Sequence, residues 1–301
     1  MDWQDFSQHL SETLNLPIHI ETAHPISGGD IHFAYQLHTS SGNYFLKLNR
    51  AESLPLFATE AHSLQAIYHT NSIRCPKVLG YGSYYNQAWL LMEHFNLSDK
   101  GDDFARGRDL AQMHHQIHDS PKPFGWFEDN YLGHTLQQNH WHFEWVDFYG
   151  QQRLKPQLEL AQLRGATSKL YQLGMELIEI LPFWFQNYKP EASLLHGDLW
   201  GGNSAFTKDS SGTVDAVVYD PASYYGDREA DIAMTELFGG YSAAFYDGYN
   251  SIFPLDSGYS SRKALYNLYH ILNHFNLFGG QYESQAFSVI EQLIQIAKTK
   301  L

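Results

Sequence analysis

A short run of polar residues near position 200 has the residue types and spacing that phosphoryl transfer requires. His196, Asp198 and Asn203 form the pattern His-x-Asp-x-x-x-x-Asn. In such a pattern a carboxylate can accept a hydroxyl proton, and an amide oxygen five residues later can hold a magnesium ion. Asp220 follows the next apolar run and can supply a second metal ligand. Because phosphoryl transfer depends mainly on positioning nucleophile, metal and phosphates, this pattern predicts the catalytic centre of a kinase.

The elements around these acids support that interpretation. A single Asp after a Gly is more often a turn residue or a helix cap. Here Asp198 and Asp220 follow the apolar, strand-like runs 194–195 and 216–219, and residues 208–212 between them have the composition of a hairpin turn. The sequence therefore predicts a short hairpin whose carboxylates face one cleft.

A lysine within a predicted strand is the next candidate. Lys47 lies in the middle of the strand-like run 44–49, and Glu60 lies in the amphipathic segment 56–68 that follows. An outward-facing lysine is the ordinary interpretation of such a residue. A strand Lys paired with a helix Glu, however, is how kinases aim an ammonium at the α- and β-phosphates of ATP. Given the centre at Asp198, the paired arrangement is favoured.

A glycine-containing turn is a further candidate for phosphate contacts. Gly28 and Gly29 lie in the turn 27–30, between two strand-like stretches. Glycine permits positive φ and leaves backbone N–H groups open to an anion. Two glycines in a hairpin are more often a plain tight turn. The chain has no G-x-x-x-x-G-K-[ST] pattern, which excludes a P-loop NTPase.

The adenine-binding hinge is assigned by position only. Glu93, His94 and Phe95 end the last strand-like run of the first third, and the sequence becomes polar directly afterwards. We therefore place a lobe boundary here. Residues 1–95 are expected to form a nucleotide-binding lobe, and residues 96–301 a helical lobe for catalysis and substrate binding.

Apolar periodicity predicts a β-rich first third followed mainly by helices. The predicted strands cover residues 18–26, 31–39, 44–49, 77–83 and 88–93. The predicted helices cover residues 3–14, 56–68, 104–118, 143–163, 167–186, 229–237 and 260–278. This order of elements predicts an α+β fold with a small β-rich lobe and a larger helical one.

Composition excludes several other classes of protein. The 301 residues are 43% apolar, with a net charge of −14, which argues against a nucleic-acid partner. No apolar run reaches the ~20 residues that span a bilayer, and the first residues lack signal-peptide features. A cytoplasmic protein without a membrane partner is expected.

The single cysteine, Cys75, excludes an intrachain disulfide and a Cys-x-x-Cys metal site. His114, His115 and His118 lack a further ligand pattern and are interpreted as packing or surface residues.

Several blocks of the chain resemble the fructosamine/ketosamine-3-kinases. They are residues 196–203, 220–226 and 238–240, together with Trp145, Phe148-Tyr149, Arg153-Leu154 and 272–276. The resemblance covers most of the chain, from about residue 26 to about residue 282. Its His-Gly-Asp-Leu element is shared with aminoglycoside and choline kinases. Trp200 and the Asp-Pro-Ala-x-Tyr-x-Gly run are more specific to the fructosamine/ketosamine-3-kinases.

The resemblance implies a protein-kinase-like fold, related to aminoglycoside phosphotransferases, that uses ATP and Mg²⁺. ATP would phosphorylate the sugar 3-hydroxyl of a ketosamine, either a small molecule or a glycated protein side chain. The 3-phosphate then eliminates spontaneously and frees the amine. The implied roles are Asp198 as proton acceptor, Asn203 and Asp220 as magnesium ligands, Lys47 with Glu60 as the phosphate-orienting pair, and residues 93–95 as the hinge. Some relatives carry a redox-active cysteine in the phosphate loop, but Ser27 starts this loop, so thiol regulation is not expected there.

Two residues are candidates for the substrate site. Trp200 offers a flat apolar face for a sugar ring and an N–H donor, although a core tryptophan is the alternative. His274 could donate to sugar oxygens or be a satisfied core histidine. Arg228 and Asp231 are expected to brace the loops by ion pairing and helix capping. Two other functions stay open: a phosphotransferase for aminoglycosides or choline, and a nucleotide-binding pseudokinase.

Overall fold

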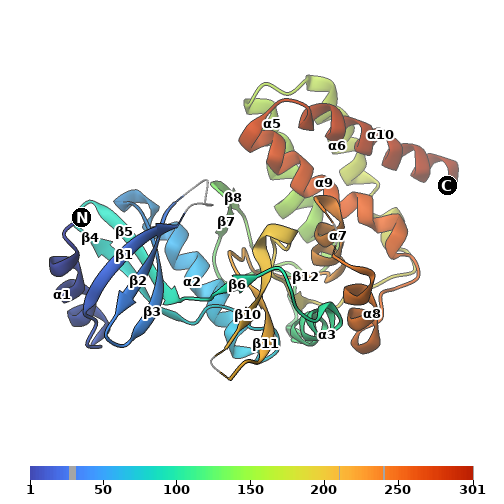
Figure 1. The fold of residues 1–301 in the computed structure, drawn as a ribbon. Helices are drawn as coiled ribbons and strands as arrows, with labels where there is room; N and C mark the ends of the chain where they lie inside the picture. The colour runs from blue at the N-terminus through green and yellow to red at the C-terminus, as the bar shows by residue number, and fades with distance from the viewer. Residues whose placement is uncertain (27–31, 210, 240, 301) are drawn as a thin grey trace. The chain divides into compact units, whose positions relative to one another are not determined.

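The computed structural model describes residues 1–26, 32–209, 211–239 and 241–300, and the chain forms two compact units. Unit 1 contains Met1–Asp102 and Ser204–Pro221. Unit 2 contains Asp103–Asn203 and Ala222–Leu301. Figure 1 shows a sheet-rich first unit and a largely helical second unit, which confirms the predicted α+β fold.

The main sheet of unit 1 is antiparallel and has five strands in the order β1-β2-β3-β5-β4. The strands are β1 (Ile20–Ile26), β2 (Phe33–Thr39), β3 (Gly42–Arg50), β4 (Val78–Tyr84) and β5 (Gln87–Glu93). In the register of β3 and β5, Lys47 lies opposite Leu90. Lys47 is therefore in the interior of the sheet, where its side chain direction is set by the pleat.

Helices α1 (Trp3–Leu14) and α2 (Leu54–His69) pack on this sheet. One core cluster joins α1 to the sheet; it contains Phe6, Leu10, Ile18, Ile20, Leu37, Leu46, Leu48, Trp89 and Leu91. Because successive side chains of a strand point to opposite faces, Leu46 and Leu48 face α1 while Lys47 faces the other side. Its ion pair with Glu60 of α2 identifies that side as the α2 face.

A second, three-stranded sheet of unit 1 has the order β11-β10-β6. Strands β10 (Ser204–Lys208) and β11 (Val214–Val218) form the predicted hairpin, and β6 (Leu97–Ser98) pairs with β10. Asp220 follows the end of β11. Asp198 lies outside the hairpin, however, because the short strand β9 (Ser193–Leu194) before it pairs with β12 (Tyr225–Gly226).

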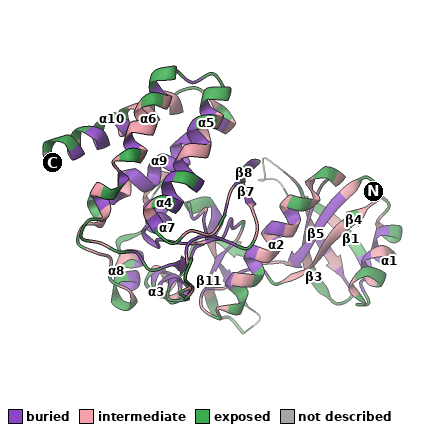
Figure 2. Cartoon of the chain, turned by 180° about the vertical axis from the view of Figure 1, so that it is seen from behind, coloured by how far each residue is buried: buried purple, intermediate pink, exposed green. Residues whose placement is uncertain are grey.

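Unit 2 is built mainly from helices. They are α3 (Asp103–His114), α4 (Trp145–Phe148), a π-helix (Tyr149–Leu154), α5 (Lys155–Leu163), α6 (Ser168–Glu179), α7 (Glu229–Leu237), α8 (Ala243–Ile252), α9 (Tyr259–Phe278) and α10 (Tyr282–Lys300). A short hairpin of β7 (Asn130–Leu132) and β8 (Thr135–Gln137) lies between α3 and α4 in the chain. Helix α9 packs against α5, α7 and α10, and Figure 2 shows it largely buried.

The helices of unit 2 differ in detail from the predicted ranges. Helix α3 ends at His114, four residues before the predicted end. The predicted helix 143–163 contains a π-helical segment, and the predicted helix 167–186 ends at Glu179 before a 3-10 turn that starts beside Pro182. Helices α8 and α10 were not predicted. Gly248 and Asn250 weaken the helical pattern of α8.

One histidine of α9 is buried in its neutral form. His270 is 5% exposed, and its Nδ1 atom has no hydrogen-bond partner in the described part of the chain. Burial, with a smaller contribution from His274, lowers the pKa of His270 from 6.5 to about 3. The unfolded chain therefore binds one more proton here than the folded chain at any pH between these values. Stability from this group is complete above pH 6.5 and decreases as the pH falls.

We expect the unfolding free energy of His270→Gln to decrease less than that of the wild type as the pH falls below 6.5. Between pH 7 and pH 5 the wild type should lose about 2 kcal/mol more unfolding free energy than the variant, since each pH unit below 6.5 costs about 1.4 kcal/mol. Urea unfolding at several pH values measures this difference. The exposed His69, replaced by Gln, is the control and should follow the wild-type slope. Parallel curves for wild type and His270→Gln would contradict the buried, neutral state of His270.

The described residues contain no helix that is both long enough and apolar enough to cross a membrane.

Candidate active site

The first cluster of the site lies in unit 1 and contains Lys47, Glu60 and Asp220. The Nζ atom of Lys47 donates to Glu60 Oε1 at 2.7 Å and to Asp220 Oδ1 at 2.7 Å. The Lys47 and Glu60 side chains are about nine-tenths buried, whereas that of Asp220 is 47% exposed. The predicted contact between Lys47 and Glu60 is thus confirmed, and Asp220 is a second partner from far along the chain.

The electrostatics of this cluster keep Lys47 charged. Burial disfavours the ammonium, but Asp220 and Glu60 outweigh this effect, and the pKa of Lys47 rises above its ordinary value. Burial also raises the pKa of Glu60, and Lys47 opposes that rise. A buried ammonium held between two carboxylates is aligned in advance, so it can bind phosphate oxygens without reorganising.

The backbone at Asp220 has an uncommon conformation. Its φ is 57°, in the left-handed region that residues other than glycine rarely adopt. Such conformations cost of the order of 1–3 kcal/mol and cluster at functional sites. Here the conformation directs a half-exposed carboxylate to Lys47 directly after strand β11.

Of the predicted hinge residues, Glu93 is the last residue of β5 and His94 and Phe95 follow it, and the side chains of Glu93 and Phe95 both contact Arg74. Glu93 accepts a hydrogen bond from Arg74 Nη2 at 2.8 Å, and the Arg74 guanidinium lies 4.8 Å from the centre of the Phe95 ring. His94 is half-buried, and burial together with His38 lowers its pKa. Gly28 and Gly29, the predicted phosphate-loop residues, lie outside the described residues.

The second cluster lies in unit 2 and contains the predicted base. Asn203 Nδ2 donates to the Asp198 carboxylate at 3.1 Å and to the Asp198 carbonyl at 2.9 Å. The backbone N–H of Asp198 donates to His196 Nδ1 at 3.2 Å. Asp198 is half-buried, while His196 and Asn203 are buried. The loop is therefore closed on itself, and it presents one partly accessible carboxylate.

Asp231 of α7 fixes the backbone of this loop. Its carboxylate accepts from the N–H of His196 at 2.6 Å and of Gly197 at 2.9 Å. Gly197 has φ 85°, and a Cβ there would lie 2.1 Å from the carbonyl oxygen of Ala222, so only glycine fits. Burial opposes ionisation of Asp231, but hydrogen bonds from His114 and the loop outweigh it, and its pKa is lowered.

His114 has a role that the sequence did not reveal. It is fully buried, with Nε2 3.1 Å from Asp231 Oδ2 and Nδ1 2.7 Å from the Tyr249 hydroxyl. Burial lowers its pKa, so the neutral ring orients Asp231 by a hydrogen bond. Among the described residues there is no group of three or more His, Cys, Asp or Glu side chains that could hold a metal ion. The one signal in the sequence for the burial of His114 is its position on the apolar face of α3.

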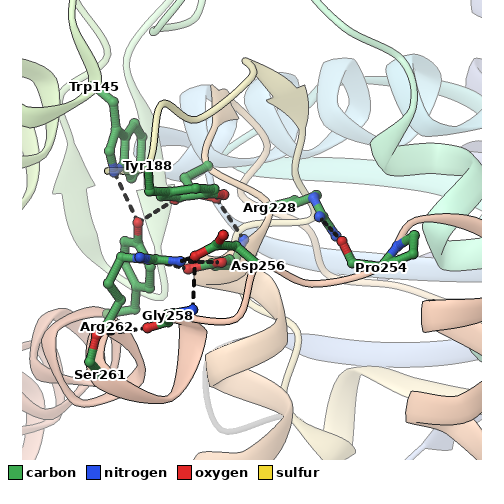
Figure 3. A network of polar contacts seen from close by, with 11 residues as sticks. Trp145, Tyr188, Arg228, Pro254, Asp256, Gly258, Ser261 and Arg262 are labelled. Carbon is green, nitrogen blue, oxygen red and sulfur yellow. Dashed lines mark hydrogen bonds and ion pairs between the residues drawn. The ribbon is translucent and has the colours of Figure 1, made fainter. Parts of the chain in front are cut away.

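Figure 3 shows a group of polar contacts in unit 2 that includes Arg228 beside Pro254, with Tyr188, Asp256 and Arg262 nearby. Arg228 donates to the carbonyls of Phe253 at 2.8 Å and of Pro254 at 2.5 Å, so it braces the chain through carbonyl groups. The cap of α7 comes from Asp227, which accepts from the N–H of Glu229 at 3.0 Å. Asp227 also binds the Tyr188 hydroxyl at 2.9 Å. Within the described residues Arg228 forms no ion pair, and the Asp231 carboxylate binds N–H groups of the loop at Asp198 and not the start of α7. The expected bracing is therefore present, but through contacts other than the predicted ion pair and cap.

Trp200 and His274, the predicted substrate residues, both belong to unit 2. Trp200 is 41% exposed, so it is not a core tryptophan. A Cβ on Gly202 would lie 2.2 Å from the indole ring, so the ring can occupy this position only because residue 202 has no side chain. His274 is half-buried, and its Nδ1 is bonded to the carbonyl of His270 at 2.8 Å. Its ring lies 4.5 Å from that of Phe238. One nitrogen of His274 thus has a structural contact.

The donor atoms in both clusters suit a hard cation. Asp220 offers a half-exposed carboxylate, and Asn203 uses its amide nitrogen for Asp198, so its amide oxygen can coordinate. Magnesium prefers oxygen ligands and retains several water molecules. Each of the two residues therefore offers an oxygen donor of the kind that magnesium binds.

Comparison with known proteins identifies one family. The family model "Fructosamine kinase" matches residues 2–296. A protein of Vibrio parahaemolyticus named "Probable ketoamine kinase" is 44% identical over 295 residues, which cover 97% of this chain and 99% of the relative. A chloroplastic protein-ribulosamine 3-kinase of Arabidopsis thaliana is 39% identical over 275 residues, covering 91% of this chain and 82% of the relative.

Solved structures agree with these matches. The crystal structure of a "Putative fructosamine-3-kinase" from Haemophilus somnus has a TM-score of 0.85 and 30% identity, and the match covers 96% of both chains. An aminoglycoside phosphotransferase has a TM-score of 0.60 with 14% identity, covering 95% of this chain and 97% of that one. At that identity the second match shows a shared fold alone.

Proposed function

Because this chain belongs to the fructosamine kinase family, we propose that it transfers the γ-phosphoryl group of ATP to the sugar 3-hydroxyl of a ketosamine. The observation that carries the proposal is the loop at Asp198. Its carboxylate is partly accessible and bonded to Asn203, and Asp231 holds the loop backbone. Such a carboxylate can accept the hydroxyl proton as the acceptor oxygen attacks phosphorus.

The roles of the remaining residues follow from their contacts. Lys47 orients the α- and β-phosphates, and Glu60 keeps its ammonium in place. Asn203 and Asp220 are the proposed magnesium ligands. A bound magnesium ion would neutralise charge that develops on the phosphate oxygens. The presence of the buried Lys47–Glu60 pair supports an active kinase over a pseudokinase.

Nucleotide binding is proposed for the first lobe, residues 1–95. The main chain of Glu93, His94 and Phe95 would bind the edge of adenine, and the N–H groups of Gly28 and Gly29 would contact the phosphates. The buried Lys47 supports the assignment, since an ammonium that carboxylates already hold in place can bind an anionic phosphate.

The proposed acceptor is a ketosamine, as a small molecule or on a glycated protein side chain. Relatives are named ketoamine kinase and protein-ribulosamine 3-kinase, and these names support the substrate class. The half-exposed indole of Trp200, two residues after Asp198, suits the apolar face of a sugar ring. The Nδ1–H group of His274 donates to the carbonyl of His270, so its Nε2 atom can accept a hydrogen bond from a sugar hydroxyl instead of donating one.

A substrate panel tests this function. Values of kcat/KM are measured for ribulose-, erythrulose- and fructose-derived ketosamines of lysine, and for kanamycin and choline, because discrimination between substrates appears in that ratio. We expect the ketosamines to give the highest values. A clear preference for kanamycin or choline would assign the chain to another group of phosphotransferases. An absence of turnover with every acceptor would favour the pseudokinase.

We expect Trp200→Ala to lose mainly sugar recognition. The KM for the ketosamine should rise by about 10- to 100-fold, as expected for a lost aromatic contact of 1.5–3 kcal/mol, while the KM for ATP stays within about twofold. Steady-state kinetics with each substrate varied in turn measures both values. Phe143→Ala removes another exposed aromatic ring of unit 2 and is the control. Equal effects of the two substitutions would remove Trp200 from the substrate site.

A further inference from the structure

Unit 2 contains a buried arginine without an acidic partner. Arg153 is 0% exposed and lies in the π-helix Tyr149–Leu154. No carboxylate of the described residues forms an ion pair with it. By contrast, Arg262 is 3% exposed and binds Glu229 at 2.7 Å. An unpaired buried charge is costly, and π-helical turns occur frequently at functional sites. Arg153 therefore needs a physical explanation.

Aromatic rings and neutral oxygens surround the guanidinium. Its Cζ atom lies 3.9 Å from the centre of the Tyr224 ring and 4.5 Å from that of Phe148. Nη1 donates to the carbonyl of Gln138 at 2.5 Å, and Nη2 donates to Asn139 Oδ1 at 2.6 Å. These contacts compensate part of the desolvation cost. They also place a donor-only group at the start of a chain of side-chain amides.

That chain has a fixed direction. A guanidinium can only donate, so Asn139 must turn its oxygen to Arg153 and its nitrogen away. Asn139 Nδ2 then donates to Asn130 Oδ1 at 2.9 Å, and Asn130 Nδ2 donates to the carbonyl of Ser223 at 2.8 Å. Each amide is oriented by the one before it. Arg153 thereby determines that Asn130 presents a donor, and not an acceptor, to Ser223.

Gln137 gives the chain a second branch. Its Oε1 accepts from the Tyr269 hydroxyl at 2.8 Å, which turns its Nε2 to Asn130 Oδ1 at 2.7 Å and to the carbonyl of Ala222 at 3.1 Å. Two successive carbonyls, those of Ala222 and Ser223, are therefore held by amides of the β7–β8 hairpin. Because Asn130 Oδ1 accepts from both branches, the two orientations depend on each other.

The segment held in this way pairs with the chain that leads to Asp198. The N–H of Ala222 donates to the carbonyl of His196 at 2.9 Å, and the N–H of Leu195 donates to the carbonyl of Tyr224 at 2.9 Å. The carbonyl of Ala222 also lies against Gly197, where no Cβ fits. A displacement of Ala222 would thus be transmitted to the residues directly before Asp198.

We propose that Arg153 is a positioning residue for phosphoryl transfer, which acts through Asn139, Asn130 and Gln137 on Ala222 and Ser223 and so fixes the backbone that carries Asp198. The inference rests on the proposed kinase function. In this role Arg153 does not contact the substrate. Its guanidinium, which can only donate hydrogen bonds, orients the amides that keep Asp198 in place.

The test replaces the amide that transmits the orientation. In Asn139→Asp the new carboxylate can form an ion pair with Arg153, but it has no N–H group to donate to Asn130. We expect kcat to decrease at least tenfold, the KM for ATP to stay within twofold, and the Tm to change by only a few degrees. A residue needed only for stability would give the opposite result, a changed Tm with unchanged kcat. Arg153→Lys keeps the charge but cannot reproduce the planar fork, so the same decrease in kcat is expected.

The control is Tyr149→Phe in the same π-helix. Tyr149 donates to the carbonyl of Leu265 at 2.9 Å and takes no part in the amide chain. This variant should keep wild-type kcat although it loses a buried hydrogen bond. If Asn139→Asp and Arg153→Lys both keep kcat within twofold of the wild type, or if Tyr149→Phe loses as much as they do, the positioning role is wrong.

A second readout separates this inference from the proposed function. Amide hydrogen exchange, followed by mass spectrometry, does not depend on any acceptor. Peptides covering residues 194–198 and 222–226 should exchange faster in Asn139→Asp than in the wild type or in Tyr149→Phe. Unchanged protection of both peptides would overturn the positioning role. A wild-type chain without turnover would overturn the kinase proposal, while the exchange result would still decide the role of Arg153.

Discussion

Replacing Asp198 by asparagine is expected to reduce kcat by about 10³- to 10⁴-fold, the upper range for loss of a general base. The side chain keeps its size and can still contact Asn203, but it can no longer accept a proton from the sugar hydroxyl. ATP affinity and Tm should stay close to the wild type, because the lost interaction exists only in the transition state. Rapid-quench kinetics and calorimetric titration with a nonhydrolysable ATP analogue measure these quantities.

Asp147→Asn provides the control for that substitution. It makes the same carboxylate-to-amide change at an exposed position of α4 in unit 2 and should leave kcat unchanged. A kcat for Asp198→Asn within tenfold of the wild type would show that another group accepts the proton. A parallel loss of ATP affinity would assign Asp198 to nucleotide binding.

Replacing Asp220 by alanine is expected to reduce kcat/KM for ATP by about 10²- to 10³-fold, the range for loss of one electrostatic contact at the transferring phosphate. The variant should also need a higher magnesium concentration for half-maximal rate, since a carboxylate ligand is lost. A magnesium titration at fixed ATP measures the change. The removal of Asp220 also leaves Glu60 as the remaining carboxylate partner of Lys47 shown by the structure.

Asp215→Ala is the matched control for Asp220→Ala. Asp215 is 41% exposed in its side chain, belongs to the same β10–β11 hairpin, and pairs with Arg74 at 3.0 Å. Its loss should leave the magnesium dependence unchanged. Full activity of Asp220→Ala at low magnesium would remove this residue from the metal site, whatever the control shows.

Local sequence patterns predicted the parts of the site that are close together in the chain. Asp198 and Asn203 are five residues apart, and hydrogen bonds hold their side chains together. The contact of Lys47 with Glu60 could be predicted from a strand lysine followed by an amphipathic helix. Their catalytic and nucleotide-binding roles remain predictions. The strand content of the first third followed from short apolar runs that are bounded by turn residues, whereas the order of the strands in the sheet was not predicted.

Contacts between residues far apart in the chain could not be predicted in the same way. Asp220 bonds to Lys47 across 173 residues, and no local pattern records that pairing. The polar chain from Arg153 to Ser223 depends on amide orientations that tertiary packing selects, and periodicity cannot show a π-helical turn. The role of Asp227 was not predicted because its partners Tyr188 and Tyr266 are far from it in the chain.

Helix α10 could have been predicted from the sequence, unlike helix α8. Its buried residues Ala286, Ile290, Leu293 and Ala297 recur at helical spacing, so the pattern was present in the sequence. Helix α8 had no such pattern: Gly248 and Asn250 lower its intrinsic propensity, and packing against α3 stabilises it instead.

The position of the transferred phosphate tests the central claim most directly. The chain is incubated with ATP, magnesium and the ketosamine of highest kcat/KM, and the product is followed by phosphorus and carbon NMR. The account predicts one new phosphate ester, coupled to C3 of the sugar, which decays to inorganic phosphate while the free amine appears. A stable ester at another sugar carbon, or consumption of ATP without any sugar phosphate, would contradict it.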